Sequence, residues 1–176
     1  MDIQETKLQD QEAISKFRGL VKDVTICMFT TVDENLELSS RPMVTTGVDD
    51  DGNVWFFTNE FSEKVNDVSK DNIVNLIYSH PQKNIYVNVR GTCSLIIDRK
   101  KMEELWSPKL TEWFPQGLAD PKICLIKVST ETAFFWNHAS SKMGLLLRAI
   151  KSVAKGDRYR ESEKGKLNLS SNQQET

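Results

Sequence analysis

The sequence is dominated by runs of β-branched and aromatic residues that are separated by short polar turns. The segment DDDGN, residues 49–53, stands between two such runs, and Asp-Gly tolerates the backbone dihedrals of a tight hairpin. No regular alternation of strand and helix patterns follows, which argues against a Rossmann fold. The sequence therefore predicts an antiparallel sheet that is closed or nearly closed into a barrel. The expected strands span residues 24–32, 38–48, 54–58, 73–79, 85–97 and 123–136.

Helical patterns flank the expected strands. Apolar residues recur at helical spacing in residues 4–22 and again in residues 143–154. Residues 98–106 predict a short helix with Asp98 as its N-cap. Residues 107–121 contain three prolines and predict a loop with short helical turns.

Length and composition limit the classes of protein to consider. The 176 residues, of which 39% are hydrophobic and 27% charged, suit one globular domain, expected over residues 1–155 and followed by a polar, mobile tail of residues 156–176. A formal net charge of −2 argues against a whole-chain nucleic-acid binder. No apolar run approaches the roughly 18 residues of a membrane span, and the first residues do not form a signal peptide. Three cysteines within apolar runs are expected to be reduced, which predicts a cytoplasmic protein. The net charge and the lack of a membrane span predict that neither nucleic acid nor a membrane is a partner.

Several familiar chemical motifs are missing. The glycines form neither a dinucleotide fingerprint nor a P-loop, and His80 and His138 are too far apart in sequence to indicate a zinc site. Asp49, Asp51 and Asn53 have the spacing of calcium ligands, but Val54 stands where a calcium loop requires glycine. A hairpin turn is the favoured interpretation of that segment, and no metal is expected.

Polar residues within the strand region stand out instead. Arg41 interrupts the expected strand 38–48 and is followed by Pro42, which removes a ladder donor. Ser62 and Lys64 open a helix-like stretch just after the run 54–58. A hydroxyl and a lysine at a helix N-terminus suit a phosphate, although an ordinary N-cap and a solvated lysine are the favoured alternative on local sequence alone.

The order of these segments resembles a known family. The stretch SSRPMVTTGVDDDGNVWFFTNEFSEKVNDVSKDNIVNLIYS and the following IYVNVRGTCSLIID resemble the general stress protein 26-like branch of the pyridoxamine 5′-phosphate oxidase superfamily. LWSPKLTEWFPQGLADPKICLIKV and AFFWN are similar to it as well, so the resemblance covers about residues 10 to 150. It implies a mainly β (α+β) fold, a six-stranded antiparallel Greek-key split β-barrel with peripheral helices. It also implies a homodimer with FMN at the subunit interface.

The resemblance implies roles for individual residues. The basic Arg41 would reach the flavin phosphate or ribityl chain, while Ser62 and Lys64 would hold the phosphate itself. Glu63 stands where relatives commonly carry an arginine, which removes one cation. Trp136 would approach the flavin from the partner subunit, with a core aromatic as the alternative. The expected cofactor-binding residues are Arg41, Pro42, Met43, Val44, Trp55, Phe56, Phe57, Thr58, Ser62, Lys64 and Trp136.

Two functions follow as expectations. The first is an FMN-dependent oxidoreductase of unknown substrate, and the second is a non-catalytic flavin-binding stress or sensor protein. Pyridoxamine phosphate oxidation itself is not expected, because Thr46 replaces a lysine of the classical oxidases and residues 137–147 lack their Arg- and His-bearing segment. No catalytic acid or base is assigned. The phosphate turn favours FMN over a related deazaflavin, although motifs alone leave that choice open.

The basic segment of residues 141–160 allows a further interpretation. A basic amphipathic helix can lie on an anionic membrane or contact nucleic acid. The favoured interpretation is that its apolar stripe packs on the barrel and leaves the charges in water.

Overall fold

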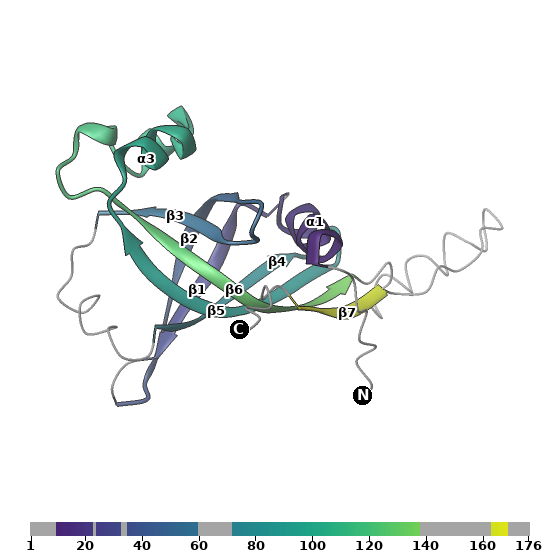
Figure 1. Cartoon of the computed structure of the whole chain (residues 1–176). Helices are drawn as coiled ribbons and strands as arrows, with labels where there is room; N and C mark the ends of the chain where they lie inside the picture. The colour runs from purple at the N-terminus through teal and green to yellow at the C-terminus, as the bar shows by residue number, and fades with distance from the viewer. Residues whose placement is uncertain (1–9, 23, 33–34, 60–71, 138–162, 169–176) are drawn as a thin grey trace, which may run out of the picture.

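A computed structural model describes residues 10–22, 24–32, 35–59, 72–137 and 163–168 (Figure 1). Its strands form one antiparallel sheet in the order β3-β2-β1-β4-β5-β6-β7, and β3 also pairs with β6. This extra pairing closes strands β1 to β6 into a barrel, and β3, β2, β1 and β4 follow one another in the spatial order of a Greek key. The expected six-stranded antiparallel barrel is confirmed. The strands are β1 (Ile26–Val32), β2 (Leu38–Val48), β3 (Val54–Thr58), β4 (Ile73–His80), β5 (Ile85–Ile96), β6 (Cys124–Asn137) and β7 (Glu163–Asn168).

The hairpin between β2 and β3 is organised by Asp49. Its Oδ1 accepts hydrogen bonds from the backbone N–H groups of Asp51, at 3.1 Å, and Asn53, at 2.9 Å. Its Oδ2 accepts from Asn53 Nδ2 at 3.0 Å and from Trp55 Nε1 at 2.8 Å. Gly52 supplies the positive φ of 80° that the turn requires. The carboxylate is therefore used by the turn itself, as the hairpin interpretation predicts.

Two apolar clusters are packed on opposite sides of the barrel wall. The first fills the barrel interior and is closed by α1 (Asp10–Val21), whose Phe17 is fully buried. The second lies outside the barrel, where α3 (Arg99–Leu105) and the segment after it cover β3 and β6. In Figure 1 the two helices lie at opposite ends of the sheet. The outer surface of the barrel is therefore buried where this second layer covers it.

The helical expectations are met where the structure describes the chain. Asp98 caps α3, accepting a hydrogen bond from the backbone N–H of Lys101 at 3.1 Å. The proline-rich stretch contains two short 3₁₀ helices, η1 (Pro108–Glu112) and η2 (Gly117–Ala119). None of the helices in the described part of the chain is long and apolar enough to cross a membrane. The helices expected over residues 62–70 and 141–160 fall outside the described residues.

Strand β7 was not expected. It lies within the stretch 156–176, predicted to be a mobile tail, and pairs with the Thr132–Asn137 part of β6. Its sequence, EKGKLN, lacks the alternation of apolar and polar residues that predicts a strand. A strand at a sheet edge is held by backbone hydrogen bonds, which do not require that alternation.

One glycine is required by close packing in the sheet. A β-bulge interrupts the register of β5 and β6 at Arg90 and Gly91. A Cβ atom on Gly91 would lie 2.3 Å from the carbonyl oxygen of Ser129, which no side chain tolerates. The bulge therefore depends on glycine at this position.

Candidate functional site

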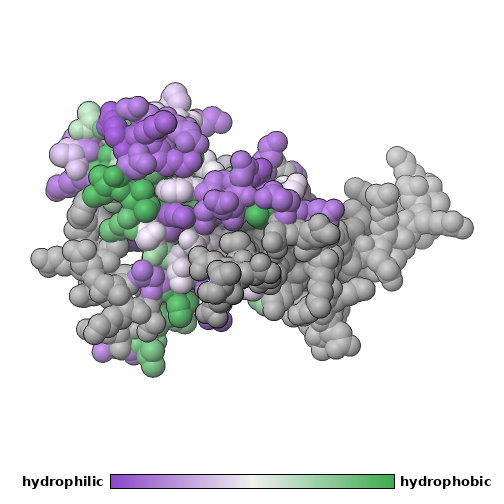
Figure 2. All heavy atoms as spheres, in the orientation of Figure 1, coloured by the Kyte–Doolittle hydropathy of each residue, from purple (hydrophilic) through white to green (hydrophobic). Residues whose placement is uncertain are grey.

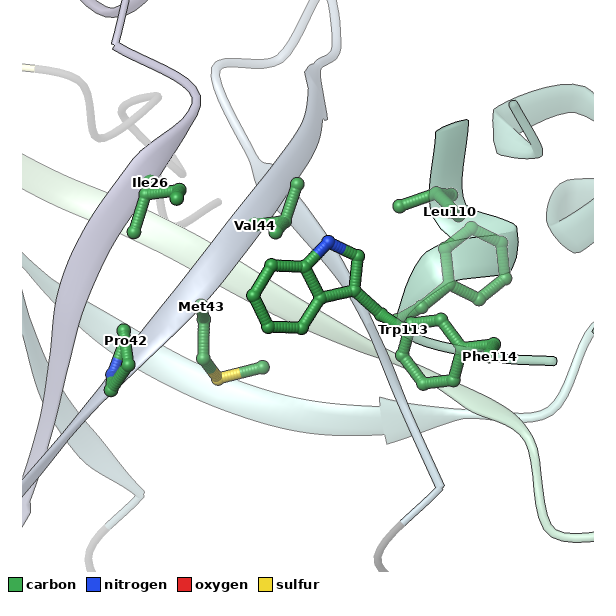
Figure 3. Close-up of a pocket in the computed structure, with 8 residues that line it drawn as sticks. Ile26, Pro42, Met43, Val44, Leu110, Trp113 and Phe114 are labelled. Atoms are coloured by element: carbon green, nitrogen blue, oxygen red, sulfur yellow. The ribbon is translucent and has the colours of Figure 1, made fainter. Parts of the chain in front are cut away.

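An apolar pocket of about 110 Å³ lies between the barrel wall and η1 (Figure 3). Strands β1, β2 and β3 supply one side, and η1 with the two residues after it supplies the other. Among the residues that the structure describes, no charged side chain lines the pocket. The lining residues are Ile26, Pro42, Met43, Val44, Phe57, Leu110, Trp113 and Phe114.

Four of the residues expected at the flavin site come together here. Pro42, Met43 and Val44 follow one another on β2, and Phe57 lies on the neighbouring β3. Val44 is paired with Ile26 of β1, which brings a third strand to the rim. The antiparallel register, set by local hairpins, is thus what gathers these side chains.

The opposite wall is one that the sequence analysis missed. Leu110 and Phe114 project from the η1 side, and Phe114 packs on Phe57 with ring centroids 6.1 Å apart. Trp106 meets the same Phe57 edge-on at 5.4 Å. The sequence did contain a signal, because Leu110, Trp113 and Phe114 have the i, i+3, i+4 spacing of one helical face.

Two polar residues of the expected site lie next to pocket-lining residues along β2 and β3. Thr58 is the last residue of β3 and is buried, and continuing the β2–β3 register places it opposite Met43. Arg41 lies two residues before Met43, with its guanidinium carbon 5.9 Å from the centre of the Phe29 ring. Ser62 and Lys64 fall outside the described residues, in the segment that begins two residues after Thr58.

Three other expected residues do not line the pocket. Phe56 points into the barrel, where its ring packs edge-on against Phe29 at 5.5 Å. Trp55 faces outward, but its indole donates to Asp49 and its ring lies 5.3 Å from the Lys101 ammonium nitrogen. Trp136 pairs with Tyr86 at the end of β6 that is remote from β3. Their assignment as flavin contacts stays a prediction.

The chain matches the protein family described as "Pyridoxamine 5'-phosphate oxidase like" over residues 12–160. It belongs to this family. The resemblance noted in the sequence is thereby confirmed at the level of the family.

Relatives of the chain are distant in sequence, and the solved structures among them are similar to it in fold. Protein bli-3 of Neurospora crassa is 24% identical over 162 residues, which are 86% of this chain and 78% of that protein. A general stress protein 26 from Jannaschia has a TM-score of 0.64 at 21% identity, covering 89% of this chain and 98% of that one. A general stress FMN/FAD binding protein from Xanthomonas citri has a TM-score of 0.62 at 23% identity, covering 74% of this chain and 92% of that one.

The thiols of this family member are not activated. Burial raises the pKa of Cys27 to about 11, even though Tyr78 and Thr45 lie within hydrogen-bonding reach of the thiol. Burial also raises the pKa values of Cys93 and Cys124. All three thiols are therefore protonated at neutral pH and are poor nucleophiles.

Within the described residues no three potential ligands gather to hold a metal ion. The pocket has the apolar walls that suit a flat ring, and the described side chains that line it supply neither acid nor base.

Apolar side chains continue from the pocket onto the outer face of the sheet. Ile26 and Met28 of β1, Ile77 of β4 and Tyr86 of β5 are between 38% and 47% exposed, and we call these four residues the β1–β4–β5 face. Met28 is paired directly with Ile77, and Ile26 also lines the pocket. In the space-filling view, apolar surface adjoins the hydrophilic layer around α3 (Figure 2). Within the described part of the chain, the β1–β4–β5 face and the pocket therefore form one continuous apolar region.

Proposed function

We propose that this protein binds FMN and acts as a flavin-dependent oxidoreductase whose substrate is unassigned. The observation that carries the proposal is the apolar pocket, which joins four residues of the expected flavin site in a family member. The Xanthomonas citri relative is described as an FMN/FAD binding protein. An isoalloxazine ring is broad, flat and aromatic, and the pocket offers apolar walls on two sides.

The residues around the pocket fit the two parts of FMN. The ring would lie against β2, and the phosphate would point toward Arg41 on β2 and Thr58 at the end of β3, with Lys64, which follows Thr58 in the sequence, as a further cation. A flavin phosphate carries close to two negative charges, which favours charge-assisted hydrogen bonds from such cations. When bound, the flavin would supply the redox chemistry, and the protein would bind and orient it.

We further propose a homodimer formed through the β1–β4–β5 face. A pocket of about 110 Å³ is smaller than the roughly 300 Å³ at which sites for drug-sized ligands begin. Protein surface beyond the described lining would therefore be needed to enclose a flavin. A two-fold pair is the commonest assembly, and the apolar face is continuous with the pocket through Ile26.

The chain's own residues argue against the classical pyridoxamine phosphate reaction. Thr46 stands where the classical oxidases carry a lysine, and its hydroxyl donates to the carbonyl oxygen of Trp55 at 2.9 Å. The Thr46 side chain therefore joins β2 to β3 within the hairpin. The second candidate function, a non-catalytic flavin-binding stress or sensor protein, is favoured because none of the described residues that line the pocket has a titratable side chain.

Cofactor analysis followed by a reduction assay tests the proposal. The released cofactor is identified by mass, and the purified protein is titrated with FMN. Bound FMN that is bleached by NADH or NADPH, and recovers with an added acceptor, would support the oxidoreductase. Stable flavin binding without bleaching would support the sensor, and failure to bind FMN would refute both.

A further inference from the structure

The side chains that line the pocket differ sharply in exposure. Met43, Phe57 and Leu110 are at most 9% exposed and form its floor. Trp113 is 56% exposed and lies at the rim, where its indole reaches from the η1 side toward Val44 on β2 (Figure 3). A ligand that rests on the floor would meet this indole on its outer side.

We propose that Trp113 stacks on the aromatic ring held in the pocket and covers its outer face. The indole would thereby set the affinity for the ring and restrict access to it from solvent. This inference rests on the proposed function, because it requires a flat aromatic ligand in the pocket.

The backbone that carries Trp113 is fixed in a hydrogen-bonded turn before any ligand binds. The carbonyl oxygen of Leu110 accepts hydrogen bonds from the N–H groups of Trp113, at 3.0 Å, and Phe114, at 2.9 Å. The carbonyl oxygen of Phe114 in turn accepts from Gly117 at 2.8 Å. Leu110 is buried beneath, so the turn that presents the indole is anchored on the apolar cluster. Such pre-organisation lowers the entropy lost when a ligand is bound.

The packing of the η1 segment does not explain the position of this indole. Trp106, seven residues earlier, uses its ring to pack edge-on against Phe57. Trp113 forms neither a hydrogen bond nor a ring contact through its indole with the rest of the described chain. A large aromatic side chain without such a contact, placed over an apolar pocket, suits the stacking of a second aromatic ring.

The test compares three variants of the full-length protein in FMN titrations followed by flavin fluorescence. Trp113→Ala should raise the FMN dissociation constant about tenfold, and Trp113→Phe, which keeps a ring, should raise it less. Trp106→Phe is the matched control, because it removes an indole of the same segment that does not line the pocket, and it should bind FMN as the wild type does. Trp113→Leu replaces the alanine variant if circular dichroism shows that the latter is unfolded.

Two further measurements distinguish stacking from a merely structural role. Quenching of tryptophan fluorescence by bound FMN should lose its largest component in Trp113→Phe but not in Trp106→Phe. Iodide should quench the flavin more strongly in Trp113→Ala than in the wild type, because the ring's outer face is then open.

The outcomes separate this inference from the proposed function. If the wild type binds FMN and Trp113→Ala binds it equally well with equal iodide quenching, the inference is overturned and the proposed function stands. A weaker dimer with unchanged FMN affinity would assign Trp113 to a subunit interface and also overturn the inference. If the wild type binds no FMN, the proposed function itself fails.

Discussion

Strand β3 is buried on both of its faces, and the two faces are covered by different parts of the molecule. Val54 and Phe56 point into the barrel, whose interior is filled by all the surrounding strands and by α1. Trp55 and Phe57 point outward, where α3 and the segment from Trp106 to Leu118 cover them. The inner cover is continuous, whereas the outer layer leaves the pocket open beside β2.

The comparison shows how one strand can serve stability and binding at the same time. Inward side chains are enclosed by a closed sheet, and their close packing leaves little space for a ligand. Outward side chains are covered by a layer that is incomplete, and apolar surface remains for a ring or for a second chain. The function is therefore expected on the outer face and the stability on the inner face.

The largest expected effect comes from the inner face. Phe56→Ala removes a ring that is fully buried and packs against Phe29, and it should lower the free energy of unfolding by about 3–5 kcal/mol. Chemical denaturation measures this loss. FMN affinity of the protein that stays folded should change little if the flavin contacts the pocket lining, to which Phe56 does not belong, and should fall if Phe56 is itself a flavin contact. Loss of FMN affinity without loss of stability would reverse the roles given to the two faces.

The next effect concerns the polar end of the proposed site. Riboflavin should bind at least a hundredfold more weakly than FMN, because two hydrogen bonds to charged groups at about 1.5–3 kcal/mol each are lost with the phosphate. Lys64→Ala and Arg41→Ala should each reproduce part of the loss, and Glu63→Arg should strengthen binding. Fluorescence titration gives the dissociation constants, with Lys100→Ala on α3 as the control. Equal affinity for the two flavins would place the phosphate elsewhere.

The barrel strands were predictable because their signal is local. Alternating β-branched and aromatic residues mark each of β1 to β6, and Asp49 to Asn53 mark the tight hairpin. The four-residue run at 54–57 shows the limit. It is apolar without interruption, so period-two geometry puts Phe56 and Phe57 on opposite faces, but the sequence does not tell which of the two points into the barrel.

The remaining features depend on contacts between distant segments. The wall of Leu110, Trp113 and Phe114 joins the pocket only because η1 folds back over β3, some fifty residues earlier in the chain. Strand β7 has a polar sequence, and its pairing with β6 leaves no pattern in that sequence. Neither feature has a signal in its own segment that specifies the partner.

A third prediction tests the β1–β4–β5 face. Ile77→Glu places a charge in the middle of the β1–β4–β5 face and should weaken the proposed dimer by about 2 kcal/mol or more, since an unpaired charge would be buried. Monomer stability should change little, because Ile77 is 43% exposed within one chain. Light scattering over a concentration series measures the association. Leu36→Glu, at a residue that is 83% exposed and outside this face, is the control. A monomeric wild type with FMN bound would contradict the proposed dimer.

The smallest effect tests the polar anchor of the outer face of β3, where Asp49 holds Trp55. Burial alone would raise the pKa of the Asp49 carboxyl, but hydrogen bonds from Asn53, Trp55 and Asp51 outweigh burial and hold the pKa below its usual value. The ionised carboxylate is thus favoured in the folded protein. Its contribution to stability is complete above the unfolded pKa of about 3.9 and is lost as the pH falls through the lower folded value.

Asp49→Asn should therefore lower the free energy of unfolding by about 1–2 kcal/mol at neutral pH, because a neutral amide has one oxygen to accept what two carboxylate oxygens accept now. The difference from the wild type should shrink as the pH is lowered below about 4, since the wild-type carboxyl is then protonated as well. Denaturation at several pH values measures it. Asp51→Asn is the matched control, because that exposed neighbour joins the turn through its backbone N–H. A difference that stayed constant down to about pH 2 would mean that the geometry of the turn, and not the charge of Asp49, holds the outer face of β3 in place.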